Sequence, residues 1–391
     1  MKKNFKNAKQ STYRTKNVLL VANWRSDVGY AWWLMENFWI RIAEMCANHG
    51  IGAYLIYPEI GVIPAAIAKS SIIVEQLEYS DNSLKGLLAI WRYIWTRNIK
   101  FIYLTDKPFF NLFYLFLRFA GVRLIVVHNH TLGTQNKPRG LRRLLKQIIA
   151  RISPLTADRI IAATDYVKQR HIEILCVPSA KSSVAHNGII PITEEHLQID
   201  MYKEFGIPDE AIVVLTTGRA SRYKGIDFII KCAGVIVKED RRADVVFLYC
   251  GAGPDMEEFQ RLAEELKLGN RFIFAGVRSN VREIIRGCDI GFDASHGEVG
   301  YSLSILEYMS AGLTTLVPDN PTVCGSIKHK INGLIYTTGD ITSACNALRT
   351  VIDDPDLRRR LGRNARETVA NNFNLATTNA ELTGILEGML R

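Results

Sequence analysis

The run AIVVLTTGRASRYKGIDF (Ala211–Phe228) starts with apolar, mostly β-branched residues and then enters a loop bounded by Gly218 and Gly225. Apolar runs without polar alternation are typical of strands that are buried on both faces of a parallel sheet. The chain turns apolar again after the loop, as a helix that covers such a sheet would. This strand–loop–helix unit predicts an α/β fold.

The same unit recurs along the chain in two series. The strand candidates of the first series are Asn17–Trp24, Ala53–Tyr57, Lys100–Thr105, Arg123–His130 and Asp158–Thr164. Those of the second series are Ala211–Gly218, Val245–Gly251, Arg271–Gly276, Ile290–Ser295 and Thr314–Pro318. Helix-like stretches separate the strands, so we expect two doubly wound, Rossmann-like domains. Such sheets bind ligands at the carboxyl ends of their strands, which predicts a ligand site in a central cleft that both domains face.

The composition is that of an ordinary globular protein, and its 391 residues suit two domains better than one core. No apolar run approaches the roughly 18 residues of a membrane span, and the basic N-terminal segment lacks the apolar core of a signal peptide. The seven cysteines are scattered without a C-x-x-C pair, which argues against a disulfide framework or a structural zinc site. We therefore expect a reducing, cytoplasmic setting.

The charge is unevenly divided between the two halves. Residues 1–193 contain 26 Lys and Arg against 11 Asp and Glu, whereas residues 194–391 contain 23 against 28. A basic first half indicates an anionic partner such as a membrane surface, a phosphorylated lipid or nucleic acid. No recognised nucleic-acid-binding motif accompanies the charge, so no nucleic-acid partner is expected.

The stretch RGLRRLLKQIIARI (Arg139–Ile152) predicts an amphipathic helix, with its leucines and isoleucines on one stripe and its basic residues largely off it. Such a helix can lie on an anionic bilayer, which would make the protein peripheral on the inner face of a membrane. Equally, the apolar stripe can face the protein core and leave a solvated basic face.

Arg219 and Lys224 lie in the glycine-bounded loop at the carboxyl end of a predicted strand. Two cations there would neutralise a diphosphate leaving group as its charge develops in the transition state. Arg222 either does the same or faces solvent. Basic loop residues are also commonly just exposed to solvent. This loop therefore indicates a diphosphate site only together with other segments.

The segment HGEVGYSLSILEYMSAGL (His296–Leu313) runs from a glycine-containing loop with Glu298 into an apolar helix that carries Glu307. The backbone N–H groups and the dipole of a helix N-terminus favour a bound anion such as phosphate. A carboxylate beside them accepts hydrogen bonds, so the hydroxyl groups of a sugar or ribose are natural partners. The alternative interpretation is a capped amphipathic helix at a domain surface.

This segment resembles the acidic signature of the retaining glycosyltransferases of family 4, which use nucleotide-sugar donors. The loop 218–225 is similar to the G-R-x-x-x-x-K-G of that family, and Arg219 and Lys224 stand at its diphosphate-binding positions. HNGI (His186–Ile189) and the stretch that follows Asp353 also resemble family segments. The resemblance therefore covers most of residues 185–375.

The resemblance implies a GT-B fold of two facing domains. Residues 1–192 would form the acceptor-side domain and residues 193–373 the domain that binds the nucleotide sugar. A terminal helix, residues 374–391, would return to complete the first domain.

The segment CGAGPDMEEFQRL (Cys250–Leu262) follows another predicted strand, but it is not a complete dinucleotide fingerprint because Pro254 follows its second glycine. In the resembled family the corresponding loop, here Gly251 and Gly253, lies beside the nucleotide, and the backbone around Val277 meets the base. Small residues that are needed only for packing at a helix start are the alternative.

One departure from the family concerns its acidic signature, a Glu followed by seven residues and a second Glu. With Glu307 as the second, which resembles the ribose-binding carboxylate, Val299 occupies the first position and Glu298 comes one residue early. Either the loop shifts so that Glu298 serves, or the donor-sugar contact is altered. The family's donor-side Gly-aromatic-Gly corresponds to Gly300, Tyr301 and Ser302.

The first half resembles the family less closely. Gly29, followed by Tyr30, stands where the family often has two adjacent glycines near the donor phosphate. The strand end VVHNHTLG supplies His128 and His130, and the resemblance implies one histidine near the donor sugar and its phosphate. The residues that follow His130, Thr131 and a glycine, favour His130, but the choice stays open.

The implied activity is the transfer of a hexosyl-type sugar from a UDP- or GDP-linked donor to an acceptor hydroxyl, with retention. The acceptor would be a glycan or a lipid-linked glycan of cell-surface polysaccharide, lipopolysaccharide or glycolipid synthesis. No cofactor is implied, and no metal is expected, since Asp353, Asp354 and Asp356 flank a proline as a turn and a helix cap would. Two alternatives are a non-catalytic nucleotide-sugar-binding protein and a nucleotide-sugar epimerase, which would turn over donor without acceptor.

Overall fold

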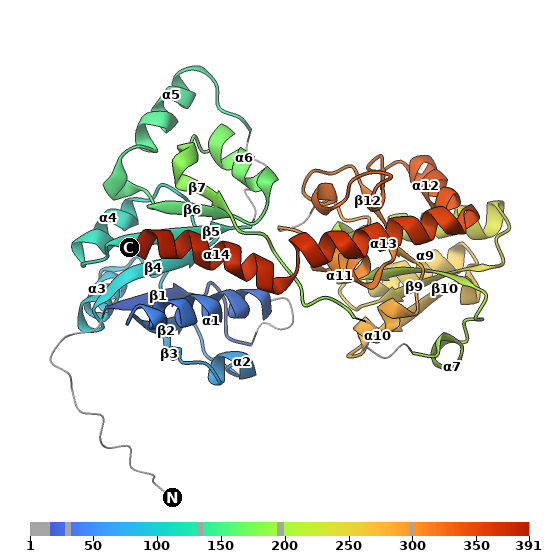
Figure 1. Cartoon of the computed structure of the whole chain (residues 1–391), viewed down its shortest axis with the longest axis horizontal. Coiled ribbons are helices and arrows are strands. Elements are labelled where there is room, and N and C mark those ends of the chain that lie inside the picture. Colours follow the sequence, from blue (N-terminus) through green and yellow to red (C-terminus); the bar gives the residue numbers. More distant parts are fainter. Residues whose placement is uncertain (1–15, 28–32, 131–135, 194–198, 298–299, 391) are drawn as a thin grey trace, which may run out of the picture. The chain divides into compact units, whose positions relative to one another are not determined.

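The computed structural model describes residues 16–27, 33–130, 136–193, 199–297 and 300–390. The chain forms two compact units. Unit 1 comprises the chain up to Ala162, Lys168–Val184 and the segment from Leu382 onwards, and unit 2 comprises Ala163–Val167 and Ala185–Glu381. Each unit has its own parallel sheet, and helices flank both sheets (Figure 1).

The sheet of unit 1 is parallel, with the strand order β3-β2-β1-β4-β5-β6-β7. Its strands are β1 (Asn17–Val21), β2 (Gly52–Tyr57), β3 (Ile73–Gln76), β4 (Ile99–Thr105), β5 (Leu124–Asn129), β6 (Arg159–Ala162) and β7 (Ser182–Val184). The helices of this part of the chain are α1 (Trp33–Asn48), α2 (Ala65–Ala68), α3 (Leu84–Thr96), α4 (Leu112–Phe119), α5 (Gly140–Ile149) and α6 (Asp165–Glu173). Every strand predicted from the first half is present: β1, β5 and β6 are shorter than predicted, and β2 and β4 each begin one residue earlier.

The sheet of unit 2 is also parallel, with the order β10-β9-β8-β11-β12-β13. Its strands are β8 (Ile212–Thr217), β9 (Val245–Cys250), β10 (Phe272–Gly276), β11 (Ile290–Phe292), β12 (Thr314–Pro318) and β13 (Leu334–Tyr336). The helices are α7 (Met201–Phe205), α8 (Ile226–Gly234), α9 (Met256–Glu265), α10 (Val281–Arg286), α11 (Leu303–Ala311), α12 (Ile341–Asp353), α13 (Pro355–Asn372) and α14 (Leu375–Leu390). The prediction of two Rossmann-like α/β domains is confirmed.

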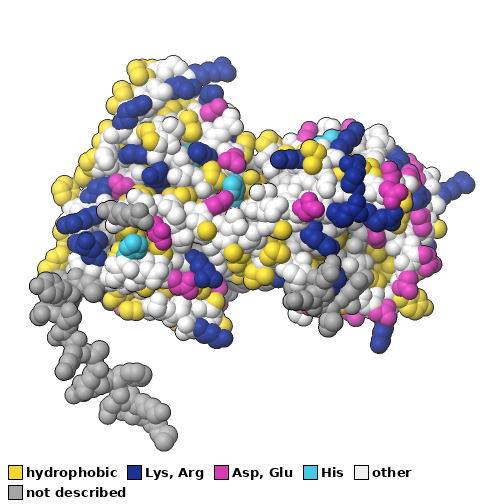
Figure 2. Space-filling model, in the orientation of Figure 1, with side chains coloured by type: hydrophobic (Ala, Val, Ile, Leu, Met, Phe, Trp, Pro, Cys, Tyr) yellow, Lys and Arg dark blue, Asp and Glu magenta, His cyan; other side chains and the backbone are white. Residues whose placement is uncertain are grey.

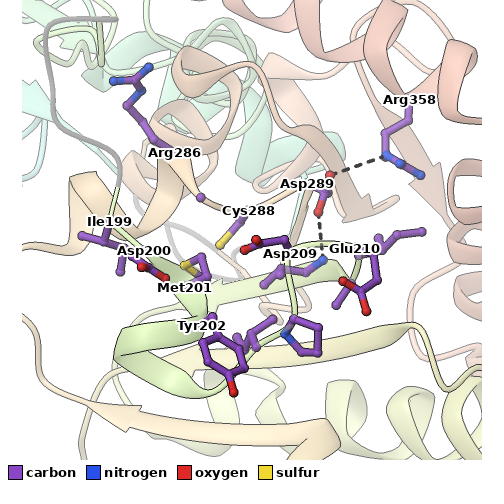
Figure 3. A pocket seen from close by; sticks show the side chains of 16 residues that line it. Ile199, Asp200, Met201, Tyr202, Asp209, Glu210, Arg286, Cys288, Asp289 and Arg358 are labelled. Atoms are coloured by element: carbon purple, nitrogen blue, oxygen red, sulfur yellow. Dashed lines mark hydrogen bonds and ion pairs between the residues drawn. The ribbon is translucent and has the colours of Figure 1, made fainter.

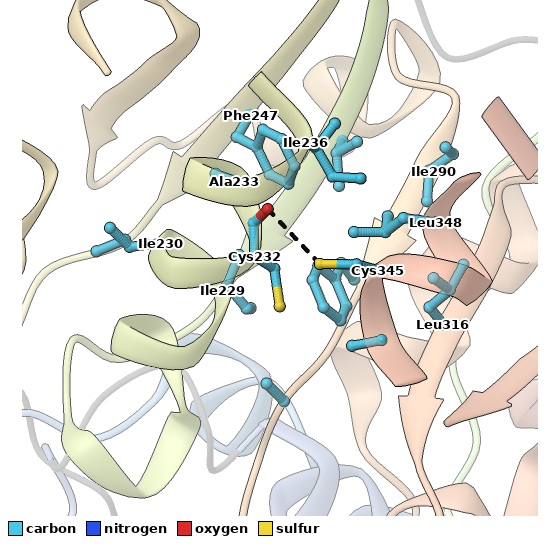
Figure 4. Close-up of a cluster of buried hydrophobic side chains, with 14 of the residues drawn as sticks. Ile229, Ile230, Cys232, Ala233, Ile236, Phe247, Ile290, Leu316, Cys345 and Leu348 are labelled. Carbon is cyan, nitrogen blue, oxygen red and sulfur yellow. Dashed lines mark hydrogen bonds between the residues drawn. The ribbon is translucent and has the colours of Figure 1, made fainter. Parts of the chain in front are cut away.

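The core of unit 2 is a cluster of buried aliphatic and aromatic side chains between the sheet and helices α8 and α12 (Figure 4). Cys232 and Cys345 belong to this cluster, and the Sγ atom of Cys345 lies 3.9 Å from the carbonyl oxygen of Cys232. All seven cysteines are free thiols. They therefore pack as small apolar side chains, in line with the scattered spacing of cysteines in the sequence.

Two kinds of feature are absent from the described residues. None of the helices has both the length and the apolar composition that crossing a membrane requires. Within the same part of the chain, no group of His, Cys, Asp or Glu side chains is arranged so that it could hold a metal ion.

Candidate functional site

The strand order of unit 2 reverses between β8 and β11, which pair directly through Ile290 with Val214 and Gly291 with Leu215. Doubly wound sheets bind ligands outside the carboxyl ends of the strands at such a reversal, because the loops that follow the two strands turn to opposite faces. The loop after β8 is the predicted basic loop, residues 218–225. The loop after β11 leads to the predicted acidic helix, α11.

These two loops are joined by backbone contacts. The N–H of His296 donates a hydrogen bond to the carbonyl oxygen of Tyr223 at 2.9 Å. Gly225 has φ +66°, and a Cβ atom at this position would lie 2.2 Å from the carbonyl oxygen of Ala294. Only glycine satisfies both conditions, since other residues rarely adopt this φ and none can fill this space. Gly225 therefore fixes the end of the basic loop against the strand that precedes the acidic helix.

The loop after β9 supports the basic loop from its other side. The N–H of Ala220 donates to the carbonyl oxygen of Ala252 at 2.9 Å. A Cβ atom on Gly251 would lie 1.9 Å from the carbonyl oxygen of Gly218, and one on Gly253 would lie 2.4 Å from that of Ala220. The structure thus gives Gly251 and Gly253 a packing role, which was the alternative interpretation of these glycines. A direct contact of either glycine with a nucleotide stays a prediction.

The basic side chains of this loop differ in their surroundings. Arg219 is exposed and forms no ion pair with the described residues, whereas the stem of Lys224 is partly buried beside Gly218. Arg222 is engaged elsewhere, because its guanidinium lies 2.9 Å from both carboxylate oxygens of Glu258 at the surface. Arg219 is therefore better placed than Arg222 to meet an anion at the strand ends.

Helix α11 begins in the segment that follows β11. Its N-cap residue, Ser302, is buried, and the Ser302 side chain forms no capping hydrogen bond. The first-turn N–H groups of a helix lack intrahelical partners, so they can bind an anion. Glu298 and Val299 lie outside the described residues, and the question of which of them faces the donor stays open.

Glu307 lies on α11, largely buried. Burial raises the pKa of its carboxyl group to about 7, against a smaller opposing effect of the positive charge of Arg282 on α10. A carboxyl group with this pKa is partly protonated at neutral pH and partly an acceptor for hydroxyl groups. A ribose contact for Glu307 fits this environment and stays a prediction.

Replacing Glu307 with glutamine is expected to stabilise the protein above pH 7. The folded-state pKa of about 7 lies above the ordinary value of 4.5, so the contribution of Glu307 to stability falls as the pH rises from 4.5 to 7. The shift corresponds to about 3 kcal/mol at most. Urea unfolding below and above this pH range measures the effect, and Glu257→Gln, at an exposed position of α9, is the control. A pH dependence shared by both variants would contradict the assignment to burial of Glu307.

Gly300 and Tyr301 hold the loop before α11 to its surroundings. Gly300 has φ +74°, and a Cβ atom there would lie 2.3 Å from Nδ2 of Asn187, the amide of the HNGI segment. The ring of Tyr301 is buried against those of His186 and Phe373, with centroids 5.6 and 4.8 Å away. Both residues therefore have clear structural roles, while their predicted donor contacts are untested.

Val277 is exposed and follows Gly276 at the end of β10. The N–H of Gly251 donates to the carbonyl oxygen of Gly276 at 2.9 Å, so the loops after β9 and β10 are neighbours. The backbone at Val277 is consequently open on the same edge of the sheet as the basic loop. This position agrees with a contact to the base, which stays a prediction.

In unit 1 the two predicted histidines lie at the end of β5. The ring of His128 is buried, and its Nδ1 atom lies 2.5 Å from the hydroxyl group of Tyr103. His130 is also buried, its backbone N–H donates to Oδ1 of Asp106 at 2.8 Å, and its Nδ1 atom lies 3.6 Å from Oδ2 of the same residue. The choice between the two histidines for a ligand contact therefore stays open. Gly29 and Tyr30 lie outside the described residues.

Comparison with known families covers most of the chain. Residues 35–191 match the family described as Glycosyltransferase Family 4, and residues 198–368 match the family described as Glycosyl transferases group 1.

The chain belongs to glycosyltransferase family 4.

Two curated relatives illustrate the similarity of this family 4 chain. The N-acetyl-alpha-D-glucosaminyl L-malate synthase of Bacillus anthracis is 26% identical over 171 residues, which are 44% of either chain. A D-inositol 3-phosphate glycosyltransferase of Corynebacterium kroppenstedtii is 25% identical over 287 residues, 68% of this chain and 61% of the relative. The matches thus span less than two thirds of the length of these relatives.

Solved structures match the fold of this chain over nearly its whole length. A glycosyltransferase from Rickettsia africae has a TM-score of 0.77 at 18% identity and covers 97% of this chain and 100% of its own. HepE from Anabaena, in complex with UDP, has a TM-score of 0.74 at 16% identity, with 95% and 100% covered. These likenesses confirm the GT-B fold that was predicted from the sequence.

The pair formed by His186 and Glu381 was not identified in the sequence analysis. His186 is the first residue of the HNGI segment, and its Nδ1 atom lies 3.0 Å from Oε2 of Glu381. Its Nε2 atom lies 3.4 Å from Oδ2 of Asp165. Burial alone would lower the pKa of His186, but the hydrogen bond that His186 donates to Glu381 and the charges of both carboxylates raise it. Because 195 residues separate His186 from Glu381, no local pattern indicates this pair.

One hollow of unit 2 lies away from the predicted donor residues. It has a volume of about 920 Å³ and is lined by residues that precede β8 and β11, among them Asp209, Glu210 and Cys288 (Figure 3). Asp289, a half-buried acid of its lining, accepts a hydrogen bond from the N–H of Val213 at 2.9 Å. The hollow therefore lies at the amino ends of the strands, the edge opposite to the one where such sheets bind ligands.

Proposed function

We propose that this protein transfers a sugar from a nucleoside-diphosphate sugar to an acceptor hydroxyl with retention and without a metal ion. The observation that carries the proposal is the contact of the basic loop, through Tyr223 and Gly225, with the segment that leads from β11 to α11, at the reversal of the strand order in unit 2. Backbone N–H groups and two cations there would supply the positive charge that a divalent cation supplies in other transferases.

Each group has a defined task in the proposed reaction. Arg219 and Lys224 neutralise the charge that develops on the leaving diphosphate, and the N-terminus of α11 binds it through N–H groups. Glu307 accepts hydrogen bonds from the ribose hydroxyls. The bond between the anomeric carbon and the diphosphate oxygen breaks, the acceptor oxygen bonds to that carbon on the same face, and the acceptor proton passes to the departing diphosphate oxygen.

The names of related proteins support the choice of substrates. Solved neighbours include Anabaena HepE in complexes with UDP and with UDP-glucose, and the lipopolysaccharide outer core galactosyltransferase WaaB. A relative from Rhizobium meliloti, 30% identical over 168 residues, is the lipopolysaccharide core biosynthesis glycosyltransferase LpsD. We accordingly propose a UDP-linked donor, with GDP as the alternative base, and an acceptor in lipopolysaccharide or cell-surface polysaccharide synthesis.

A second candidate is a nucleotide-sugar-binding protein without catalysis. It is favoured by a single observation, Val299 in place of the first acid of the family signature. Such a protein would bind the donor and release no nucleotide, whereas an epimerase would convert the donor with no acceptor present.

A thermal-shift panel of nucleoside diphosphates and nucleotide sugars tests the donor site. We expect one nucleotide family to raise the melting temperature of the wild type, and Lys224→Ala to abolish the rise, because the mutation removes a cation from the diphosphate site. Arg222→Ala is the matched control, since Arg222 lies in the same loop but pairs with Glu258. Folded wild-type protein that responds to no nucleotide would refute the proposal.

A further inference from the structure

Helix α5 is packed with its polar side towards the protein and its apolar side towards solvent. Leu141, Leu144, Leu145 and Ile148 are between 50% and 71% exposed, and no residue of the helix is buried. On the opposite side, Nζ of Lys146 donates to the carbonyl oxygen of Ile174 at 3.1 Å, and Ala150, the C-cap residue, is buried. The expectation of a core-facing apolar stripe is therefore wrong for this helix.

Helix α3 also exposes an apolar stripe. Leu84, Leu88, Trp91 and Trp95 lie at helical spacing along one side and are between 37% and 89% exposed. The other side of α3 is buried in the core of unit 1 through Ile90 and Ile94. The exposed stripe therefore lies on a different side of α3 from the residues that hold the helix on the sheet.

Helix α4 joins the stripes of α3 and α5. Its Phe116 ring lies 5.6 Å from that of Trp91 on α3, and its Leu112 and Phe119 are exposed. The short turn Ser153–Leu155, which follows α5, lies on α4, because the N–H of Asn111 donates to the carbonyl oxygen of Leu155 at 2.9 Å. We call the exposed apolar residues of α3, α4 and α5 the apolar face. Several exposed apolar side chains on neighbouring elements mark interaction sites more often than single exposed residues do.

The apolar face lies in the most basic part of the chain. Residues 82–157, which contain α3, α4 and α5, hold 13 Lys and Arg and a single acid, Asp106. Figure 2 shows hydrophobic and basic side chains side by side on the edge of unit 1 that carries α4 and α5. Leucine and tryptophan flanked by Lys and Arg are typical of helices that lie in the headgroup region of a bilayer.

We propose that the apolar face docks unit 1 on the surface of a lipid bilayer that contains anionic lipids. The apolar stripes enter the boundary between headgroups and acyl chains, and the surrounding cations meet the lipid charges. A nucleic-acid partner would use the cations but leave the leucines and tryptophans in water. The proposal concerns binding and does not depend on which donor the protein uses.

Sedimentation of the full chain with vesicles tests this proposal. We expect the wild type to sediment with phosphatidylcholine vesicles that contain phosphatidylglycerol, at low salt, and less with phosphatidylcholine alone or at high salt. The double substitution Leu144→Ser and Ile148→Ser is expected to weaken binding at least tenfold, because two apolar side chains no longer enter the bilayer. Ile331→Ser, at a similarly exposed position of unit 2, should bind as the wild type does.

Charge-reversing substitutions test the electrostatic part of vesicle binding. Arg139→Glu with Arg142→Glu, at the start of α5, should weaken vesicle binding and reduce its salt dependence. The control is Arg360→Glu with Arg363→Glu, an exposed pair with the same spacing on α13 of unit 2. Melting temperatures confirm that each variant is folded, and nucleotide binding in the same samples separates a failure here from a failure of the proposed function.

Three outcomes would overturn the proposal. The first is folded wild-type protein that stays in the supernatant with anionic vesicles at low salt. The second is an equal loss of binding in the α5 variants and in their controls. The third is a wild-type dimer in vesicle-free solution that the α5 serines convert to monomer, which would assign the apolar face to a second copy of the chain.

Discussion

Replacing Lys224 with alanine is expected to lower turnover by a factor of about 10² to 10³, the usual effect of removing one electrostatic contact to a transition state. The leaving diphosphate gains charge as the bond to the sugar breaks, so a cation at this place stabilises the transition state more than the ground state. Arg219→Ala should have an effect of similar direction. Because the two side chains serve the same group, their effects should not add.

Release of nucleoside diphosphate from the donor measures this effect without an identified acceptor, since slow hydrolysis of the donor uses the same leaving group. Arg222→Ala should keep the wild-type rate, because the Arg222 side chain is paired with Glu258 at the surface. If Lys224→Ala released nucleotide as fast as Arg222→Ala, Lys224 would have no part in leaving-group stabilisation.

Replacing Gly225 with alanine is expected to lower the free energy of unfolding by about 3 kcal/mol. The left-handed φ of +66° contributes about 1–2 kcal/mol of this for a residue with a Cβ atom. The remainder comes from the contact of that Cβ with the carbonyl oxygen of Ala294, which would lie 2.2 Å away and must be relieved by a backbone shift. The shift would separate the basic loop from the strand before α11, so donor affinity should fall as well.

Gly339→Ala is the matched control for this substitution. Gly339 also has a left-handed φ, +76°, but a Cβ atom there meets nothing within 4 Å, so only the conformational cost of about 1–2 kcal/mol is expected. Urea unfolding of both variants separates the two contributions. Equal losses would mean that the contact between Gly225 and Ala294 relaxes at no cost.

The long strands were predictable because their composition is decisive. β8 and β9 are continuous apolar runs that are buried from both faces, and such runs are read directly from the sequence. β3 and β7 were missed for a physical reason. β3 is a partly exposed edge strand with two polar residues, and β7 is an edge strand of three residues, two of them serine. No such reason applies to β13, which is as short as the predicted β11.

The site was predictable at the level of segments and less so at the level of side chains. The basic loop and the acidic helix do follow neighbouring strands at the reversal of the strand order. The inward position of Tyr301 and the packing role of Gly251 could not be read from the sequence, because both depend on distant neighbours. The orientation of α5 was equally hidden, since an amphipathic pattern does not state which of its sides meets the protein.

Unit 1 depends on the last residues of the chain. Leu382 and Leu386 of α14 are fully buried and belong to unit 1, whose first strand is formed by residues 17–21. During synthesis on the ribosome, the last strand of unit 2 ends at Tyr336, but α12 and α13, which supply core residues such as Leu348 and Leu361, emerge after it. Unit 2 can therefore complete its core only once α13 has emerged. Unit 1, although synthesised first, must wait for α14 to bury the leucines that finish its core.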